Sequence, residues 1–155
     1  MRGRKSSRRR REMAERITKA FYWKLAIPDR PGEGARVLQA LKDHKVNLVA
    51  FSGFPRGRKT QMDFVPANAA AFQKAMRKAG FRLGGKRTVF LIQGGDRLGA
   101  VHGVMEKLGR AGINVTALEA VADGKGHFGA MLWVKPADVR KAAKALGISG
   151  TFPTG

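Results

Sequence analysis

An internal repeat with a fixed offset of 67 residues is the feature of this sequence that most constrains its fold. The segment Asp29-Arg30-Pro31-Gly32 returns as Asp96-Arg97-Leu98-Gly99, each residue 67 positions later (96 − 29 = 67). The same offset, without a gap, joins further identical pairs, which are Val37 and Val104, Leu41 and Leu108, Asn47 and Asn114, Ala50 and Ala117, Lys74 and Lys141, and Gly80 and Gly147. This register predicts two copies of one structural unit.

The first copy carries signals for strands and helices in a clear order. Alternating apolar residues in AFYWKLAI (20–27) indicate a strand, and a helical pattern runs from 33 to about 44. KVNLVAFSG (45–53) and TQMDFV (60–65) indicate two strands joined by the basic turn FPRGRK. An alanine-rich helix (67–80) that ends at Gly80 and a short strand, FRL, complete the copy.

The second copy repeats this order. TVFLIQ (88–93) is almost wholly apolar, which is typical of a strand at a sheet centre or covered on both faces. A helix over 98–112 follows, and the strands 112–122 and 127–134 flank the hairpin signal Asp123-Gly124-Lys125-Gly126. A helix that opens with Pro136 runs to Gly147, and ISGTF (148–152) is the expected closing strand.

The order β-α-β-β-α-β predicts the fold class α+β, with two tandem ferredoxin-like units. Each unit is expected to form an antiparallel sheet with two helices on one face. The expected boundaries are a basic, flexible tail over 1–19, a first domain over 20–84 and a second domain over 85–155. Units of roughly 65 residues are near the lower limit of independent stability, so we expect them to pack together, with sheets joined either edge to edge or face to face.

Charge and composition bound the function. The formal net charge is +20, and MRGRKSSRRRRE alone holds seven basic residues and one acid. Such charge favours nucleic acid or anionic lipid as a partner; a solvated basic surface with a disordered tail is the alternative interpretation. The absence of cysteine excludes disulfides and cysteine-based metal sites. Without an apolar run of membrane-spanning length or a signal-peptide centre, we expect a cytoplasmic protein with no membrane partner.

The repeated segments Asp29–Gly32 and Asp96–Gly99, called the first and second elbow, each predict a cradle for an anion. A helix that begins just after a glycine presents unpaired backbone N–H groups and the positive end of its dipole, where a carboxylate can bind. Arg30 or Arg97 would add a charge-assisted hydrogen bond. Asp29 or Asp96 would receive an ammonium group, or serve as a cap or turn residue.

The two repeated asparagines extend this prediction. Asn47 and Asn114 begin the strand after each helix, which we expect to lie beside the first strand of its unit. Their amides both donate and accept hydrogen bonds, so they suit the two ends of an amino acid. The alternative is that Asp-Arg-x-Gly is only a strand-to-helix turn, and that each asparagine only satisfies backbone groups at a helix-to-strand junction.

DRPGEGARVLQALKDHKVNLVAFSG resembles the signature of the ACT family of small regulatory domains, and DRLGAVHGVMEKLGRAGINVTALEA is a second copy. The resemblance covers roughly Phe21 to Ile148. It implies binding of amino acids or similar ligands at interfaces between ACT units, which commonly pair into an eight-stranded sheet and regulate an enzyme or regulator. The ligand-contacting positions it implies are Asp29, Arg30, Pro31, Gly32, Asn47, Asp96, Arg97, Gly99 and Asn114.

The second copy departs from this pattern. Leu98 replaces the elbow proline, and Gly94-Gly95 stands where the first copy has Ile27-Pro28. We therefore expect a looser second elbow, with one of the two sites degenerate. No enzyme domain is recognisable here, so the resemblance implies a separate protein as the regulated target.

No catalytic or metal-binding pattern emerges. The three histidines have no partner at metal-ligand spacing, and the serines lie outside nucleophile motifs. Neither elbow follows phosphate-loop or dinucleotide-binding spacing. The other carboxylates read as surface and turn residues, namely Glu33, Asp43, Asp63, Glu106, Glu119, Asp123 and Asp138. We expect neither catalysis nor a cofactor.

Two interpretations remain. The leading one is a noncatalytic regulatory dimer that senses an amino acid or small carboxylate. The alternative is a nucleic-acid-binding protein that uses its ferredoxin-like units and basic tail, because RNA-recognition modules share this fold. Against it, TQMDFV and HFGAMLWV lack the aromatic-and-glycine pattern of those modules.

Overall fold

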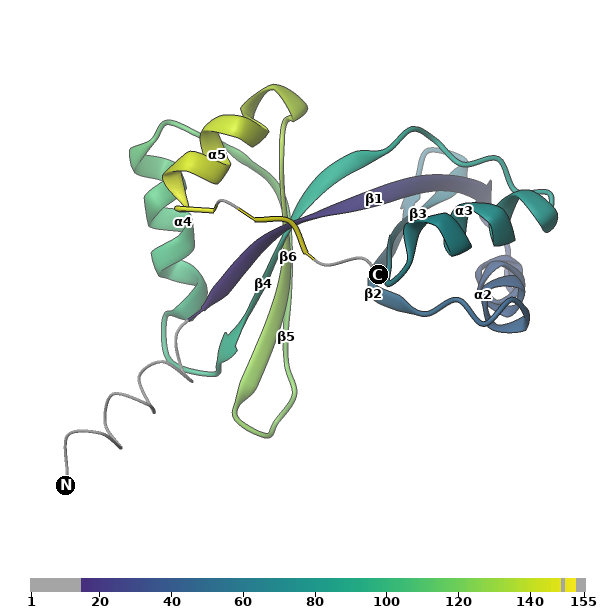
Figure 1. Ribbon diagram of the computed structural model, residues 1–155, viewed down its shortest axis with the longest axis horizontal. Helices are drawn as coiled ribbons and strands as arrows, with labels where there is room; N and C mark the ends of the chain where they lie inside the picture. Colours follow the sequence, from purple (N-terminus) through teal and green to yellow (C-terminus); the bar gives the residue numbers. More distant parts are fainter. Residues whose placement is uncertain (1–14, 149, 153–155) are drawn as a thin grey trace. The chain divides into compact units, whose positions relative to one another are not determined.

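The computed structural model describes residues 15–148 and 150–152, so most of the predicted tail lies outside the described residues (Figure 1). The chain divides into two compact units. The first unit holds Phe21–Arg87, and the second unit holds Thr88–Phe152 together with the residues up to Ala20. No helix in the described part of the chain is long and apolar enough to cross a membrane.

The first unit buries one face of an antiparallel sheet under two helices. Its elements are β1 (Arg16–Pro28), α2 (Glu33–Asp43), β2 (Leu48–Arg56), β3 (Lys59–Pro66) and α3 (Ala69–Lys78), with strand order β2-β3-β1. The core joins alternate residues of β1 and β3 to both helices: Trp23, Leu25, Ile27, Met62, Phe64, Val37, Leu41, Phe72, Ala75 and Met76. The period-two and helical patterns therefore predicted these five elements correctly.

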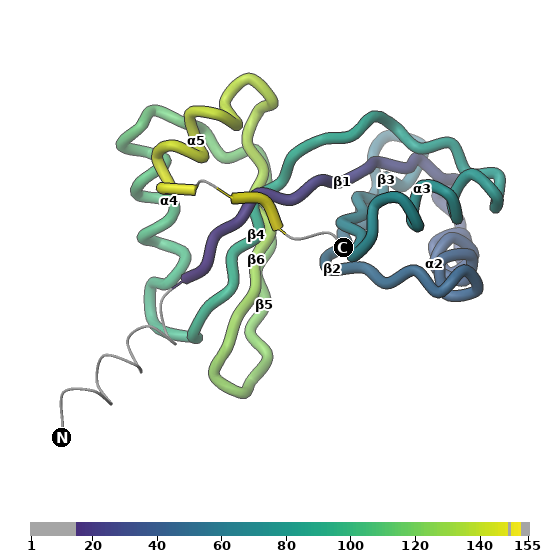
Figure 2. The backbone as a smooth tube through the Cα atoms, in the orientation of Figure 1, coloured from purple at the N-terminus to yellow at the C-terminus, as the bar shows by residue number. Residues whose placement is uncertain are grey.

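The second unit repeats this arrangement. Its elements are β4 (Arg87–Gly95), α4 (Ala100–Arg110), β5 (Val115–Ala122), β6 (His127–Val134), the short 3-10 helix η1 (Pro136–Asp138) and α5 (Val139–Ala145). Figures 1 and 2 show α4 and α5 on the same side of the β4-β6-β5 sheet. Val89, Phe90, Leu91 and Ile92 are all buried, so β4 is covered on both faces, as its apolar run predicted.

The start of β1 belongs to the second unit. Ile17 packs against the core of that unit, and β1 neighbours β4 in the strand order. The prediction of a flexible tail through residue 19 is therefore wrong for residues 16–19, whose β-branched Ile17 and Thr18 favour a strand.

Both predicted closing strands are wrong. Among the described residues of ISGTF, Thr151 forms an isolated parallel bridge to Lys19, and the Phe152 N–H donates to the Lys19 carbonyl. The place next to β4 that a closing strand would fill is taken by β1. FRL is not a strand, although Phe81 and Leu83 pack against the first core and the Gly84 N–H donates to the Lys24 carbonyl at 2.9 Å.

Deletion of residues 1–19 is expected to destabilise the second unit relative to deletion of residues 1–14. The longer deletion removes the first four residues of β1, the strand that neighbours β4, and exposes apolar surface around Ile17, so we expect a loss of at least about 1 kcal/mol. Urea unfolding measures the difference. Superimposable unfolding curves for the two deletions would contradict this role of residues 16–19.

Candidate functional site

The first elbow joins β1 to α2 through a left-handed glycine. Gly32 is the N-cap of α2 with φ 88° and ψ −17°, and it provides no side-chain cap for the helix. A Cβ at Gly32 would meet no atom within 4 Å. Glycine is therefore required by the backbone conformation and not by lack of space.

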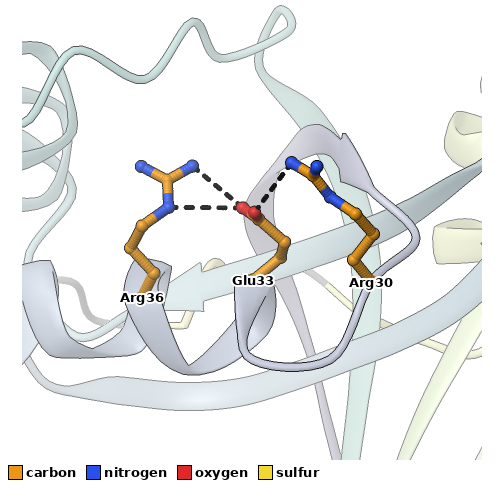
Figure 3. Close-up of polar contacts among 3 residues, drawn as sticks. All are labelled: Arg30, Glu33 and Arg36. Atoms are coloured by element: carbon orange, nitrogen blue, oxygen red, sulfur yellow. Dashed lines mark hydrogen bonds and ion pairs between the residues drawn. The ribbon is translucent and has the colours of Figure 1, made fainter.

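Arg30 binds a carboxylate of its own chain. Its Nη2 lies 3.2 Å from Glu33 Oε1, while Arg36 places Nε and Nη2 at 3.2 and 3.1 Å from Glu33 Oε2. Figure 3 shows the Glu33 carboxylate between the two guanidinium groups. The Arg30 side chain is 70% exposed, so its ion pair contributes at most about 1 kcal/mol to stability. A ligand carboxylate can therefore compete for Arg30 at low cost.

Asp29 ties the elbow to the neighbouring strand. Its Oδ1 accepts a hydrogen bond from Thr60 Oγ1 at 2.9 Å. Thr60 pairs with Ile27 in the β1-β3 ladder, so this bond holds the elbow against the start of β3. Asp29 and Pro31 are both exposed, and ammonium binding by Asp29 stays a prediction.

The second elbow has the same backbone. Gly99, the N-cap of α4, has φ 73° and ψ 16°, so the change from proline to Leu98 leaves the left-handed glycine in place. The Leu98 side chain is fully exposed, and the Asp96 N–H donates to the Gly126 carbonyl at 2.9 Å. Arg97 forms an ion pair with Glu15, which precedes β1. Both elbow arginines thus hold a carboxylate.

The expectation that the strand after each helix lies beside the first strand of its unit is wrong, because β3 lies between β2 and β1, and β6 lies between β5 and β4. Each asparagine also lies away from the elbow of its own unit. Pro28, at the end of β1, pairs with Lys59 at the start of β3, whereas Leu48, next to Asn47, pairs with Pro66 at the end of β3. At about 3.3 Å per residue, the two ends of β3 lie about 20 Å apart.

The second unit separates Asn114 from its elbow in the same way. Gly95 pairs with His127 and Val115 with Val134, at the two ends of β6. The physical reason is the crossover connection: an intervening helix returns the chain to the far end of the sheet, where a strand parallel to the first begins.

A series of hydrogen-bonded polar side chains, which includes the buried Gln61 and Asp63 of β3, was not predicted from the sequence. Asp63 is only 5% exposed, which overturns its interpretation as a surface or turn residue. Arg56 Nη1 donates to Gln61 Oε1 at 2.8 Å, and Gln61 Nε2 donates to Asp63 Oδ1 at 2.9 Å. The alternation in TQMDFV places Gln61 and Asp63 on one face, but only tertiary packing buries that face.

Burial raises the pKa of Asp63, although the hydrogen bond from Gln61 and the positive charges of Lys24, Arg87 and Arg56 oppose the shift. Lys24 faces Asp63 across the β1-β3 ladder, and burial together with nearby Arg87 lowers the pKa of Lys24. The cluster combines one desolvated carboxylate with three cations.

The histidines make local contacts. His44 Nδ1 lies 2.8 Å from the Ala40 carbonyl oxygen, and His127 Nδ1 lies 3.4 Å from Asp123 Oδ2. Within residues 15–148 and 150–152, no three histidine, aspartate or glutamate side chains gather in a metal-binding group.

Comparison with known proteins identifies the fold. No family model and no curated protein matches the sequence. Among solved structures, a Bacteroides thetaiotaomicron protein has a TM-score of 0.72 and 16% identity, over 84% of this chain and 88% of that one. The ligand-free regulatory subunit of Thermus thermophilus aspartate kinase has a TM-score of 0.59 and 17% identity, over 87% of this chain and 95% of that one. The regulatory subunit of Thermus flavus aspartate kinase has a TM-score of 0.53 and 19% identity, over 86% of this chain and 94% of that one.

The fold is therefore one that regulatory subunits of aspartate kinase share. The two-unit, ferredoxin-like α+β architecture implied by the resemblance to ACT domains is confirmed.

Replacing Gly32 with alanine is expected to destabilise the protein, and replacing Gly34 with alanine to stabilise it. Gly32→Ala forces a side chain into left-handed backbone, at a cost of about 1–2 kcal/mol. Gly34 lies inside α2, where its Cβ would make only an ordinary contact with Met62 at 3.9 Å, so Gly34→Ala should gain about 0.5–1 kcal/mol. Chemical denaturation measures both, and shifts of the same sign would contradict this account of the elbow.

Replacing Asp63 with asparagine is expected to remove the cost in folding free energy of burying a charged carboxylate, a cost that depends on pH. The pKa of Asp63 is raised in the folded state, so between the ordinary pKa of 3.8 and this raised pKa the folded state binds more protons than the unfolded state. The contribution of Asp63 to stability therefore rises as pH falls through that window. Relative to wild type, Asp63→Asn should be most favourable at neutral pH, and its advantage should shrink toward pH 4.

Urea unfolding of wild type and Asp63→Asn between pH 7 and pH 4 measures this difference. Asp43→Asn, at the exposed end of α2, is the control. If the stability of Asp63→Asn relative to wild type instead increases on acidification, burial does not raise the pKa of Asp63 as described.

Proposed function

We propose that this protein is a noncatalytic regulatory protein that binds an amino acid or a related small carboxylate through its elbows. The observation that carries this proposal is that both elbow arginines hold a carboxylate beside a helix N-terminus that begins at a left-handed glycine. A free ligand carboxylate would replace Glu33 or Glu15 and also gain the helix N–H groups. The fold shared with regulatory subunits of aspartate kinase supports a regulatory role.

The placement of the asparagines supports a ligand site built from more than one unit. Asn47 and Asn114 lie at the ends of their sheets away from the elbows, so one unit cannot offer both groups to a small ligand. A site that uses an elbow and an asparagine must draw them from different units. We therefore propose a homodimer whose packing the ligand stabilises.

Regulation follows from differential affinity. A ligand that binds one packing of units more tightly than another shifts the population toward it, and a bound enzyme or regulator would sense that shift. We propose such a separate cytoplasmic protein as the target.

A thermal-shift screen of the full chain against the twenty amino acids, at several salt concentrations, tests the proposal. We expect a rise in melting temperature with at least one amino acid, which persists at high salt and is lost in Asn47→Ala or Asn114→Ala. Both asparagines are exposed, so the fold should survive these changes. Absence of any response would refute the binding of amino acids.

Nucleic-acid binding is the second candidate, favoured by the charge of the first unit. Residues 21–87 carry 14 basic and four acidic side chains, and the exposed Arg56, Arg58 and Lys59 surround the β2-β3 turn. Stabilisation by RNA or DNA that falls steeply with salt, without an amino-acid response, would favour this candidate.

A further inference from the structure

The second unit contains a cavity of about 380 Å³. It lies among α4, the end of α5 and the residues that lead into β1. Ile17, Val104, Leu146 and Ile148 form its apolar wall, which is the smaller part of its lining. A volume of this size falls within the range of about 300–1,000 Å³ that is usual for small-molecule sites.

The polar groups of the cavity have both signs of charge. Arg97 and Lys107 line it together with Glu15, and Arg97 and Glu15 form an ion pair. None of the ion pairs within the described residues includes Lys107. Two cations and one carboxylate beside an apolar wall match the carboxylate, ammonium and side chain of an aliphatic amino acid.

The internal repeat shows why the second unit has this space. The positions that correspond to Gly103 and Ile148, 67 residues earlier, are Arg36 and Phe81. In the first unit the Arg36 guanidinium lies over the Phe81 ring, 4.8 Å from its centroid. The second unit has a smaller residue at both positions, and Gly103 lines the cavity.

We propose that this cavity binds an aliphatic L-amino acid. Its carboxylate would bind Lys107 and Arg97, its ammonium group Glu15, and its side chain the apolar wall. The inference rests on the proposed function and narrows its ligand class, but it places one site within a single unit and uses no asparagine. Binding in this cavity should therefore survive Asn47→Ala and Asn114→Ala. Under this proposal only the second elbow lies beside a ligand cavity, since side chains fill the corresponding space in the first unit.

Filling the cavity tests the proposal. Gly103→Leu places a side chain in the cavity; a Cβ at Gly103 meets no atom within 4 Å, and its backbone is not left-handed. Gly109→Leu, on the same helix but outside the cavity, is the matched control. Calorimetric titration of the full chain uses L-leucine, L-isoleucine and L-valine as probes.

We expect at least one probe to bind wild type and Gly109→Leu equally, and Gly103→Leu at least about tenfold more weakly. The corresponding amine and carboxylic acid should also bind at least about tenfold more weakly, because each loses a charge-assisted contact. Lys107→Gln, an exposed substitution on α4, should weaken the probe without disturbing the fold.

Equal binding to Gly103→Leu and wild type would overturn the cavity proposal and leave the proposed function intact. Binding of another amino acid with no binding of the three probes would do the same. Failure of all twenty amino acids to bind would overturn this inference together with the amino-acid part of the proposed function.

Discussion

The burial of one apolar sheet face under two helices is the constraint on which each unit depends. In the first unit, Trp23, Leu25 and Ile27 of β1 meet Met62 and Phe64 of β3 under α2 and α3, and the second unit repeats this packing. Each connecting helix crosses the sheet and delivers the chain to its far end. The elbows therefore lie at one end of each sheet and the asparagines at the other, so a site that uses both requires more than one unit.

Internal carboxylates occupy both elbow arginines, but they come from different places. Glu33 is the first residue of α2 and directly follows the first elbow in the sequence. Glu15 precedes β1, which reaches the second unit by pairing with β4. The second elbow thus depends on a segment distant in sequence. An exposed ion pair of this kind contributes little to stability, so the proposed ligand could replace either carboxylate at low cost.

Several features were predictable from residues alone because they depend on local geometry. Period-two alternation identified Trp23, Leu25 and Ile27 as one buried face, and helical spacing identified Val37 and Leu41. The offset of 67 residues predicted matching elbows, and both begin a helix at a left-handed glycine. The closing strands were wrong because β1 and β4 lie beside each other, so each fills the place that a closing strand would take next to the other. This pairing joins segments far apart in the sequence, and no local pattern records it.

The sequence by itself determined the two units, their helices, six of the eight predicted strands and the elbow backbone, since periodicity and glycine conformation act over a few residues. Only the tertiary structure decided that Asp63 is buried, that Asn47 and Asn114 lie away from their elbows, and that residues 16–19 complete the second sheet. It also decided that Gly103 and Ile148 leave a cavity where Arg36 and Phe81 meet in the first unit. Burial, register and empty volume arise from contacts between distant segments, and a pattern along one chain carries no direct record of them.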